Sequence, residues 1–432
     1  MVILARITSQ FLSKNPSMKP IWTVSLFVIL FLAYINGPKT VNQQHSLPAL
    51  VNTDSLTQAL NELYSLGYIN GYAVTLVNDT GPLYQKGFGY MDVAAKKPYT
   101  DSTVQNIASI SKTFIGISLM KAQELGKLKL DDPINSYLPF KVINPYFPEK
   151  EITIRHLATH TSSITDTKYY NKKSYVLKEN IPAGKLKDLN ETFNSPSTKT
   201  TLMKFLPMIL DAKGKYYKKN GFLKELPGTK FDYSNIGATL AALVLEQATG
   251  VPFDEFSVKY ILNPLKMDAS GWAYDQIDLS MHSKLYSDKK TELPFYELIT
   301  YPDGGMRTTA KDMAKYLTEL IKAKTGKGTL LNPDSYKEYF KEQLNESHFE
   351  ERDSVFPYND EYNMGIFMGH SGNGTIGHTG GDPGVSSLMF FDPTTGIGRF
   401  LMMNTSLSSQ EGANEFFGIM KALGDYSAKL NE

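Results

Sequence analysis

Apolar positions near the start of the folded region recur first with helical spacing and then with strand spacing. In "SLTQALNELYSLG", Leu56, Leu60, Leu63 and Leu66 fall on one helical face, and Gly67 supplies a terminating residue. The next segments, "YAVTLVND" and "LYQKGFGYMDV", alternate apolar and polar residues on either side of the turn sequence "DTGP". The pattern predicts a helix followed by a β-hairpin, which is typical of an α/β or α+β architecture.

The rest of the chain divides into a helical middle and a strand-rich end. A helical pattern over residues 109–125 is closed by Gly126, and helical segments separated by Pro- and Gly-rich loops continue to about residue 300. The late segment "GHTGGDPGVSSLMFFDPTTGIGRFLMMNT" predicts two or three strands, and "QEGANEFFGIMKALGDYSAKL" predicts a closing helix. We therefore expect one sheet built from about 53–105 and 300–430, with a helical region at about 106–300 inserted between these segments.

The N-terminal segment carries "IWTVSLFVILFLAYI", residues 21–35, an apolar run preceded by basic residues. The run has the length of a secretory signal, because a membrane-spanning helix usually needs about 20 apolar residues. No small-x-small cleavage site is visible near Gly37, so a permanent membrane anchor stays open. Residues 1–37 are predicted to be a signal peptide or an N-terminal membrane anchor, with Met18 as an alternative start.

A polar segment with two prolines follows the apolar run. Residues 38–52, "PKTVNQQHSLPALVN", are predicted to be a linker, and residues 53–430 are predicted to be the folded domain. Both interpretations of the N-terminus predict export of this domain to a periplasmic or extracellular location.

Composition excludes several classes of function. A formal net charge of +1 gives no general attraction to nucleic acid, so no nucleic-acid partner is expected. The chain has no cysteine, which removes disulfides, thiolate nucleophiles, cysteine zinc sites and lipidated cysteine anchors. Any covalent catalysis must use another nucleophile.

One segment, residues 168–225, departs from the near-equal numbers of basic and acidic residues in the whole chain. It contains 13 lysines against five acidic residues, together with two tyrosine pairs at Tyr169, Tyr170 and Tyr216, Tyr217. The simplest interpretation of these lysines is a solvated helical surface. The functional alternative is that they contact an anionic wall polymer or lipid headgroups. The lysines are Lys168, Lys172, Lys173, Lys178, Lys185, Lys187, Lys199, Lys204, Lys213, Lys215, Lys218, Lys219 and Lys224.

The segment "QNIASISKTFIGISLMKAQELGKL" places Ser109 three positions before Lys112 at the start of a predicted helix. Residues three apart on a helix are neighbours, so the lysine amine can lie against the serine hydroxyl. Burial and a nearby cation would lower the pKa of the lysine, which could then accept the serine proton. A helix N-terminus also offers unpaired N–H groups to an oxyanion. A bare S-x-x-K is short, however, and an N-cap serine with a surface lysine is the alternative.

Two further segments carry polar residues suited to acyl transfer. In "LPGTKFDYSNIGATLAALVLEQATG", Tyr233 and Asn235 stand in a loop before an apolar helix; a phenol there can transfer protons and an amide can hold a substrate carbonyl. In "IGHTGGDPGV", His378, Thr379, Gly380 and Gly381 precede a predicted strand, and a strand-edge N–H group there can complete an oxyanion hole. Taken singly, each segment is also explained as a turn with a packed side chain.

Together these motifs resemble the class C serine β-lactamases and the related D-alanyl-D-alanine peptidases, D-amino-acid peptidases and esterases of the penicillin-recognising superfamily. The resemblance runs from about residue 55 to 428 and also includes "GKLKLDDPINSYLP", "TIRHLATHTSSI", "YILNPLKM" and "GGMRTTAKDMAKYL" in family order. It implies an α/β (α+β) β-lactamase/transpeptidase-like fold, with an antiparallel sheet flanked by helices and a mostly helical second subdomain.

The resemblance also implies a role for each motif residue. Ser109 would be the nucleophile, Lys112 its activating partner, and Tyr233 the general base and acid that shares the proton with Lys112. The oxyanion hole would use the N–H groups of Ser109 and Gly381. Four residues would bind substrate, namely Asn235, His378, Thr379 and Gly380. The resemblance implies neither a cofactor nor a metal.

The sequence departs from the family pattern at two positions. Class C β-lactamases usually carry lysine where this chain has His378, and histidine at this place is found in family peptidases and esterases. A mostly neutral imidazole attracts a substrate carboxylate less than an ammonium does. In "HTSSI", Ser163 stands where glycine is usual. The histidine at position 378 weakens the case for efficient β-lactam hydrolysis.

Other motifs are weaker. His156 and His160 have i, i+4 spacing, but no glutamate follows His156 as in the zinc-protease motif, so no metal site is predicted. "GHSGNG", residues 369–374, resembles a nucleophile elbow but lacks the final glycine because Asn373 occupies its place.

The sequence thus predicts an exported serine hydrolase that forms an acyl-enzyme on an ester, amide or D-amino-acid peptide. D-alanyl-D-alanine carboxypeptidase action and weak β-lactamase action are alternatives. A further alternative is a non-catalytic, penicillin-binding-like muropeptide sensor or scaffold. The expected partner is a small-molecule or peptide substrate that could derive from the cell wall, with membrane contact through residues 21–35 if that segment is retained.

Overall fold

The centre of the fold is an antiparallel sheet that joins strands from near both ends of the described chain. The computed structural model describes residues 53–182 and 192–430, which belong to one compact unit. The segments interpreted as signal or anchor, 1–37, and as linker, 38–52, lie outside the described residues, as do Lys185 and Lys187. The main sheet has eight strands in the order β10-β11-β12-β13-β14-β1-β2-β3.

The strands of this sheet come from two distant parts of the sequence. Strand β1 pairs with β14 in antiparallel register, with Tyr72 opposite Met403. The predicted first hairpin and the late strands are therefore confirmed, and the late segment forms three long strands. The eight strands are β1 (Gly71–Asn78), β2 (Gly81–Asp92), β3 (Lys97–Pro98), β10 (Asn363–Met364), β11 (Gly369–His370), β12 (Ile376–Asp382), β13 (Val385–Asp392) and β14 (Ile397–Met403).

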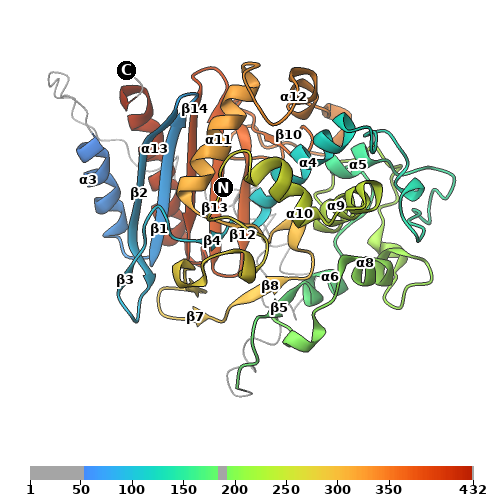
Figure 1. Ribbon diagram of the computed structural model, residues 1–432, viewed down its shortest axis with the longest axis horizontal. Coiled ribbons are helices and arrows are strands. Elements are labelled where there is room, and N and C mark those ends of the chain that lie inside the picture. Colours follow the sequence, from blue (N-terminus) through green and yellow to red (C-terminus); the bar gives the residue numbers. More distant parts are fainter. Residues whose placement is uncertain (1–52, 183–191, 431–432) are drawn as a thin grey trace, which may run out of the picture. The chain divides into compact units, whose positions relative to one another are not determined.

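Helices cover both faces of the sheet. Helices α3 (Thr53–Tyr64) and α13 (Gln410–Leu430) pack on each other on one face, and α11 (Ala310–Lys324) packs against β1, β2 and β14 on the other (Figure 1). The predicted first helix ends three residues before Gly67, which has the left-handed φ of 85°. This three-layer arrangement confirms the predicted α/β class.

The helical part of the fold packs around one buried helix, α9 (Asn235–Thr249), which contacts α4, α5 and α8. The segment also contains short strand pairs, β5 with β8 and β6 with β7, so it is less purely helical than the sequence pattern indicates. The remaining α-helices are α4 (Lys112–Glu124), α5 (Ile154–Ala158), α6 (Lys168–Lys173), α8 (Leu202–Leu210), α10 (Phe253–Ser257) and α12 (Pro333–Tyr339). The remaining strands are β4 (Gln105–Asn106), β5 (Tyr175–Leu177), β6 (Leu285–Tyr286), β7 (Glu292–Leu293), β8 (Tyr296–Leu298) and β9 (Arg307–Thr308).

Within the described ranges, no single helix has both the length and the apolar composition needed to cross a membrane. Helix α9 together with the segment 253–262 meets those two criteria, but the pair is bent by 81° at the break between them.

Candidate active site

The predicted nucleophile and its lysine lie together where a short 3₁₀ helix, η1 (Ala108–Ser111), passes into α4. Lys112 Nζ is 2.9 Å from Ser109 Oγ and donates a hydrogen bond to the backbone carbonyl oxygen of Asp303 at 2.7 Å. Lys112 is completely buried, whereas Ser109 is partly exposed. The α-helix begins three residues later than predicted, because the chain enters it through the tighter turn that presents Ser109.

The backbone before Ser109 is held in an unusual conformation. Ala108 has a φ of 49°, in the left-handed region that costs a non-glycine residue about 1–3 kcal/mol. Strand β12 crosses this segment so closely that a Cβ on Gly380 would lie 2.4 Å from the Ile107 carbonyl oxygen. The segments predicted to supply the oxyanion hole, at Ser109 and Gly381, therefore adjoin each other.

Burial dominates the electrostatics of Lys112. It lowers the pKa of the amine, while four surrounding carboxyl groups act in the opposite direction, in decreasing order Asp303, Asp166, Asp382 and Asp360. A neutral amine can donate to the Asp303 carbonyl and still offer its lone pair to the Ser109 hydroxyl. The arrangement is therefore suited to removing the serine proton.

Tyr233 faces the same place, immediately before α9. Its ring stacks on the His160 imidazole with centroids 4.4 Å apart, and Lys112 Nζ lies 5.1 Å from its centroid. The hydroxyl is buried beside Ser109, with no well-aligned hydrogen-bond partner among the described residues. Burial raises the pKa of Tyr233 well above its ordinary value, although Ser109 is near enough to lower it in part. Burial therefore keeps this phenol in its protonated form.

Asn235 is the first residue of α9, and its side chain is already engaged. Asn235 Nδ2 donates to Asp166 Oδ2 at 2.7 Å, and Asp166 Oδ1 accepts the Ile236 N–H at 3.0 Å. Burial raises the pKa of Asp166, against the effect of these hydrogen bonds. Asn235 is predicted to bind substrate through its side-chain amide, and the nitrogen of that amide already donates a hydrogen bond to Asp166.

His378 and Thr379 both contact Asp360, a buried aspartate that the sequence did not single out. His378 Nδ1 lies 3.0 Å from Asp360 Oδ2 and 2.6 Å from the Thr379 carbonyl oxygen. The Thr379 N–H donates to Asp360 Oδ2 at 2.8 Å, and the Thr379 hydroxyl contacts the same carboxylate at 3.1 Å. Burial favours a higher pKa for Asp360, but His378 and the Thr379 N–H outweigh it and hold the pKa below its ordinary value.

Two other carboxyl groups near the site are destabilised in their charged form. Burial, with Asp360 and Asp232 nearby, raises the pKa of Glu361 to about 8. Burial, with Asp303 nearby, raises the pKa of Asp382 to about 7, although Tyr175 donates to Asp382 Oδ1 at 2.6 Å.

The structure brings the three motifs of the sequence together and adds residues that the motifs do not contain. Asp166, Asp303, Asp360 and His160 each contact or neighbour a motif residue. His160 lies inside the segment "TIRHLATHTSSI" and Asp303 directly precedes "GGMRTT". Both segments belong to the family resemblance, so the sequence does offer a signal that these two residues lie near the site. Asp360 has no such signal.

The departure at Ser163 has a local explanation. Its φ is 62°, in the left-handed region where glycine is favoured, and Ser163 Oγ accepts a hydrogen bond from Asn144 Nδ2 at 2.8 Å. The side chain thus gains a buried partner in a conformation that glycine adopts without strain.

The weaker motifs serve local structure. His156 Nδ1 accepts the Thr153 N–H at 3.2 Å in the capping box of α5, while His160 stacks on Tyr233. Ser371 of "GHSGNG" is hydrogen-bonded within its own turn to Asn373 and Thr375. In the described part of the chain, no group of three or more His, Cys, Asp or Glu side chains is placed to hold a metal ion.

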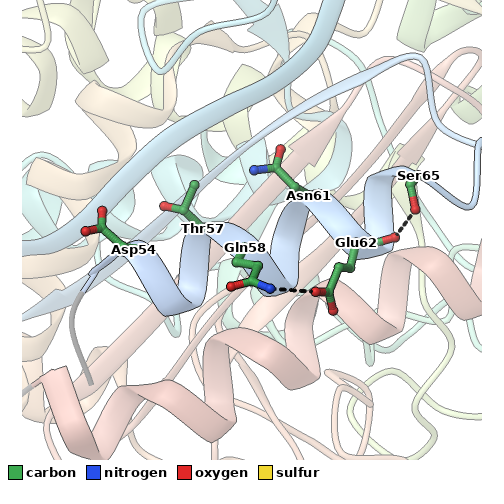
Figure 2. Close-up of a pocket in the computed structure, with 6 residues that line it drawn as sticks. All are labelled: Asp54, Thr57, Gln58, Asn61, Glu62 and Ser65. Carbon is green, nitrogen blue, oxygen red and sulfur yellow. Dashed lines mark hydrogen bonds between the residues drawn. The ribbon is translucent and has the colours of Figure 1, made fainter. Parts of the chain in front are cut away.

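A separate hollow follows the solvent-facing side of α3 (Figure 2). Six polar residues line it, and two of their groups already bond within the helix: Gln58 Nε2 donates to Glu62 Oε1 at 3.1 Å and Ser65 Oγ donates to the Glu62 carbonyl oxygen. No lysine lies among these lining residues, so the hollow has no counterpart of the Ser109–Lys112 pair. The lining residues are Asp54, Thr57, Gln58, Asn61, Glu62 and Ser65.

The lysine-rich segment presents most of its described lysines to solvent but also reaches the site. Tyr169 and Tyr216 stack with centroids 3.8 Å apart, and Tyr170 OH donates to Asp303 Oδ2 at 2.5 Å. The lysines that are exposed are Lys168, Lys172, Lys199, Lys204, Lys213, Lys215, Lys218, Lys219 and Lys224.

A partly exposed serine against a buried lysine, in a mixed α/β fold, defines a serine hydrolase with a β-lactamase-like architecture. The chain belongs to the Beta-lactamase family, whose model matches residues 56–423. This match confirms the resemblance found in the sequence motifs.

Two curated relatives illustrate the spread of the family. Protein flp of Staphylococcus aureus (strain MW2) is 23% identical over 346 residues, which cover 78% of this chain and 60% of that protein. The human mitochondrial serine beta-lactamase-like protein LACTB is 28% identical over 311 residues, covering 61% of this chain and 54% of that protein. The match thus spans about 60% or less of the length of these relatives.

Solved structures share the fold at low identity. The octameric penicillin-binding protein homologue from Pyrococcus abyssi superimposes with a TM-score of 0.61 at 21% identity, over 86% of this chain and 78% of that chain. D-amino acid amidase from Ochrobactrum anthropi SV3, complexed with L-phenylalanine amide, superimposes with a TM-score of 0.60 at 19% identity, over 86% of this chain and 98% of that chain. D-alanine carboxypeptidase AmpC from Burkholderia cenocepacia superimposes with a TM-score of 0.58 at 19% identity, over 86% of this chain and 100% of that chain.

Proposed function

We propose that this protein hydrolyses esters, amides or D-amino-acid peptides through an acyl-enzyme at Ser109. The observation that carries the proposal is the 2.9 Å contact between Ser109 Oγ and the buried amine of Lys112, whose pKa is lowered by burial. The Ser109 oxygen attacks the substrate carbonyl while Lys112 and Tyr233 share its proton. The oxyanion is bound by the N–H groups of Ser109 and Gly381, Tyr233 protonates the leaving group, and water then releases the acyl group.

The charges around Ser109 favour acyl donors that carry no carboxylate. The carboxyl groups of Asp166, Asp303, Asp360 and Asp382 surround Lys112, and position 378 carries histidine in place of the usual lysine. A substrate carboxylate would find no ammonium at position 378 and would meet the Asp360 carboxylate, whose pKa is held below its ordinary value, whereas a neutral or ammonium-bearing donor would meet no such repulsion. Small esters and D-amino-acid amides or peptides therefore rank before D-alanyl-D-alanine termini and β-lactams, both of which carry a carboxylate.

The first experiment measures the intact mass of the full chain after exposure to a fluorophosphonate and, separately, to a penicillin. Ser109→Ala is the test variant, and Ser102→Ala, which removes a partly exposed hydroxyl from a nearby loop, is the matched control. A Ser109-dependent adduct that decays with product release is the expected result. An adduct that persists, or no adduct in a folded sample, would support the non-catalytic sensor or scaffold instead.

Substrate charge is tested with matched p-nitrophenyl esters. The full chain should hydrolyse a p-nitrophenyl pentanoate with a higher kcat/KM than the glutarate monoester, which has the same carbon chain ending in a carboxylate, and added salt should narrow the difference. A higher kcat/KM for the anionic ester would favour the carboxypeptidase or β-lactamase alternative.

We also propose that the protein is exported, with residues 21–35 as the signal or anchor. The support is the apolar run itself and its basic flank. Cell fractionation of the full chain beside a variant with two arginines inserted into the run tests this, since the charged variant should stay inside the cell. Equal distribution of both proteins would argue against export by this segment.

A further inference from the structure

We propose that the lysine-rich side of the helical region binds the surface of an anionic lipid bilayer. The inference goes beyond the proposed hydrolase function and does not depend on it. We call the binding surface the basic patch, which is made of the exposed side chains of Lys168, Lys172, Lys215, Lys218, Lys219 and Lys224.

Contacts between aromatic rings hold the separate segments of the basic patch together. Lys168 and Lys172 lie on α6, and Tyr169 of the same helix stacks on Tyr216 with ring centroids 3.8 Å apart. Lys215 Nζ lies 5.2 Å from the centroid of the Tyr216 ring. Helix α6 and the later lysine-bearing segment therefore form one surface.

A second set of contacts adds Lys224 to this surface. Lys224 Nζ lies 5.8 Å from the centroid of the Tyr146 ring, and Asn144 Nδ2 donates to the Leu223 carbonyl oxygen at 3.0 Å. Burial, with Tyr146 nearby, also raises the pKa of Tyr217. Lys224 thus adjoins the segment that carries the other lysines.

The charges of the basic patch are not neutralised by neighbouring side chains. Within residues 53–182 and 192–430, none of its six lysines forms an ion pair with a carboxylate. These cations therefore act together and attract an extended anionic surface. The acidic residues of the segment 168–225 are Glu179, which pairs with Lys178, Glu225, which pairs with Lys230, Asp211, whose Oδ1 accepts the Lys213 N–H, and Asp188 and Glu191, which lie outside the described residues.

An apolar edge beside the basic patch favours a bilayer over a soluble polyanion. It consists of Ile143, which is 40% exposed, and of Tyr146 and Leu226, which are each 37% exposed. Exposed apolar side chains next to cations suit the boundary between headgroups and acyl chains, where aromatic rings and lysine stems also lie. A polymer of phosphates offers these side chains no apolar phase. The apolar edge therefore supports an anionic bilayer as the partner, and not an anionic wall polymer.

Helix α6 connects the basic patch to the candidate active site. Its exposed side carries Lys168 and Lys172, whereas the buried Tyr170 donates to Asp303 Oδ2 at 2.5 Å. The Asp303 carbonyl oxygen in turn accepts the hydrogen bond from Lys112. A bilayer bound at the basic patch would therefore lie one helix away from the residue that holds Lys112.

Co-sedimentation of the full chain with lipid vesicles tests the proposal. Every protein in the test carries two arginines inserted into residues 21–35, so that this apolar run does not itself enter the bilayer. We expect binding to vesicles of phosphatidylcholine and phosphatidylglycerol in equal amounts, little binding to phosphatidylcholine alone, and weaker binding as salt is raised. Equal binding to the two kinds of vesicle would overturn the proposal.

Two quadruple variants separate the basic patch from the total charge. The patch variant, with Lys215→Gln, Lys218→Gln, Lys219→Gln and Lys224→Gln, should lower the apparent partition coefficient at least roughly tenfold. The control variant makes the same charge change at exposed lysines outside the patch and should bind like the unsubstituted protein. Equal losses in the two variants would overturn the basic patch as the binding surface. The control substitutions are Lys127→Gln, Lys129→Gln, Lys311→Gln and Lys337→Gln.

A pair of leucine variants tests the apolar edge. Leu226→Ser should lower the partition coefficient roughly threefold or more, because a side chain that enters the bilayer is lost. Leu125→Ser, at a leucine that is 43% exposed outside the apolar edge, should leave it unchanged, and thermal unfolding checks that each variant is folded. Equal binding by the two serine variants, with patch-dependent retention on immobilised polyphosphate, would overturn the bilayer and indicate an anionic polymer.

Discussion

The buried amine of Lys112 is anchored by the backbone carbonyl oxygen of Asp303, 2.7 Å from Nζ, and not by a carboxylate. A carbonyl fixes the position of the amine without the full stabilisation of its charge that a paired carboxylate would give. This contact therefore allows burial to lower the pKa of Lys112 while keeping Nζ within 2.9 Å of Ser109 Oγ.

Replacing Lys112 by methionine should abolish labelling of Ser109 without lowering the free energy of unfolding. The lysine pKa is lower in the folded protein than its ordinary value of 10.5, so the unfolded chain binds more protons between those two values. The free energy of unfolding of the parent should therefore rise with pH across that window, and the Lys112→Met protein should lack this rise. Urea unfolding at several alkaline pH values measures the difference; equal slopes would contradict the assigned burial effect.

Glu361→Gln should flatten the pH dependence of stability on the acidic and neutral side. The pKa of Glu361 is raised from 4.5 to about 8 by burial, so its stabilising contribution is present below the unfolded value and is lost as pH rises through about 8. The free energy of unfolding of the parent should fall between roughly pH 4.5 and 8 relative to the variant. Asp382 acts in the same direction to about pH 7, so the variant should keep a smaller slope. A variant with the parent's slope would show that Glu361 does not titrate in this range.

Gly380→Ala should impair both stability and acylation. The added Cβ would lie 2.4 Å from the Ile107 carbonyl oxygen and from Ser387 Oγ, which forces β12 away from the backbone before Ser109. Overpacking of this kind costs about 1–3 kcal/mol. Gly412→Ala in α13 is the control, because its Cβ would meet only ordinary contacts from 3.5 Å, and a helical alanine should not destabilise. Thermal unfolding and the labelling rate together test this; a Gly380→Ala protein labelled at the parent's rate would contradict the close approach.

Tyr170→Phe should slow acylation by disturbing Asp303. The Tyr170 hydroxyl and Thr239 Oγ1 donate to Asp303 Oδ2 at 2.5 and 2.8 Å, and burial raises the pKa of this carboxyl group. Losing one donor to a buried carboxylate costs about 1–3 kcal/mol and loosens the residue whose carbonyl holds Lys112. Tyr260→Phe, at a partly exposed tyrosine, is the matched control. Parent-like stability and labelling in Tyr170→Phe would show that this hydrogen bond is dispensable.

The motif residues could be predicted because each motif is local in sequence and its spacing carries the chemistry. Ser109 and Lys112 are neighbours on one turn, and Tyr233 is next to the start of the helix that positions it. Asp360 could not be predicted in this way, because its contact with His378 is made between separate segments and no periodic pattern surrounds it. The sequence pattern starts this helix at Ser109, three residues before α4, because apolar spacing over a single turn does not distinguish a 3₁₀ helix from an α-helix.

The pairing of β1 with β14 has a consequence for biogenesis. Strands β1 and β14 are separated by more than three hundred residues, so a ribosome-bound chain holds the β1–β2 hairpin without β14 until synthesis is almost complete. Folding through such distant pairings is slow, because the entropy of closing the long intervening loop must be overcome first. The site also needs β12, which pairs with β13 beside β14. The emerging polypeptide is therefore catalytically silent until its last strands have joined its first.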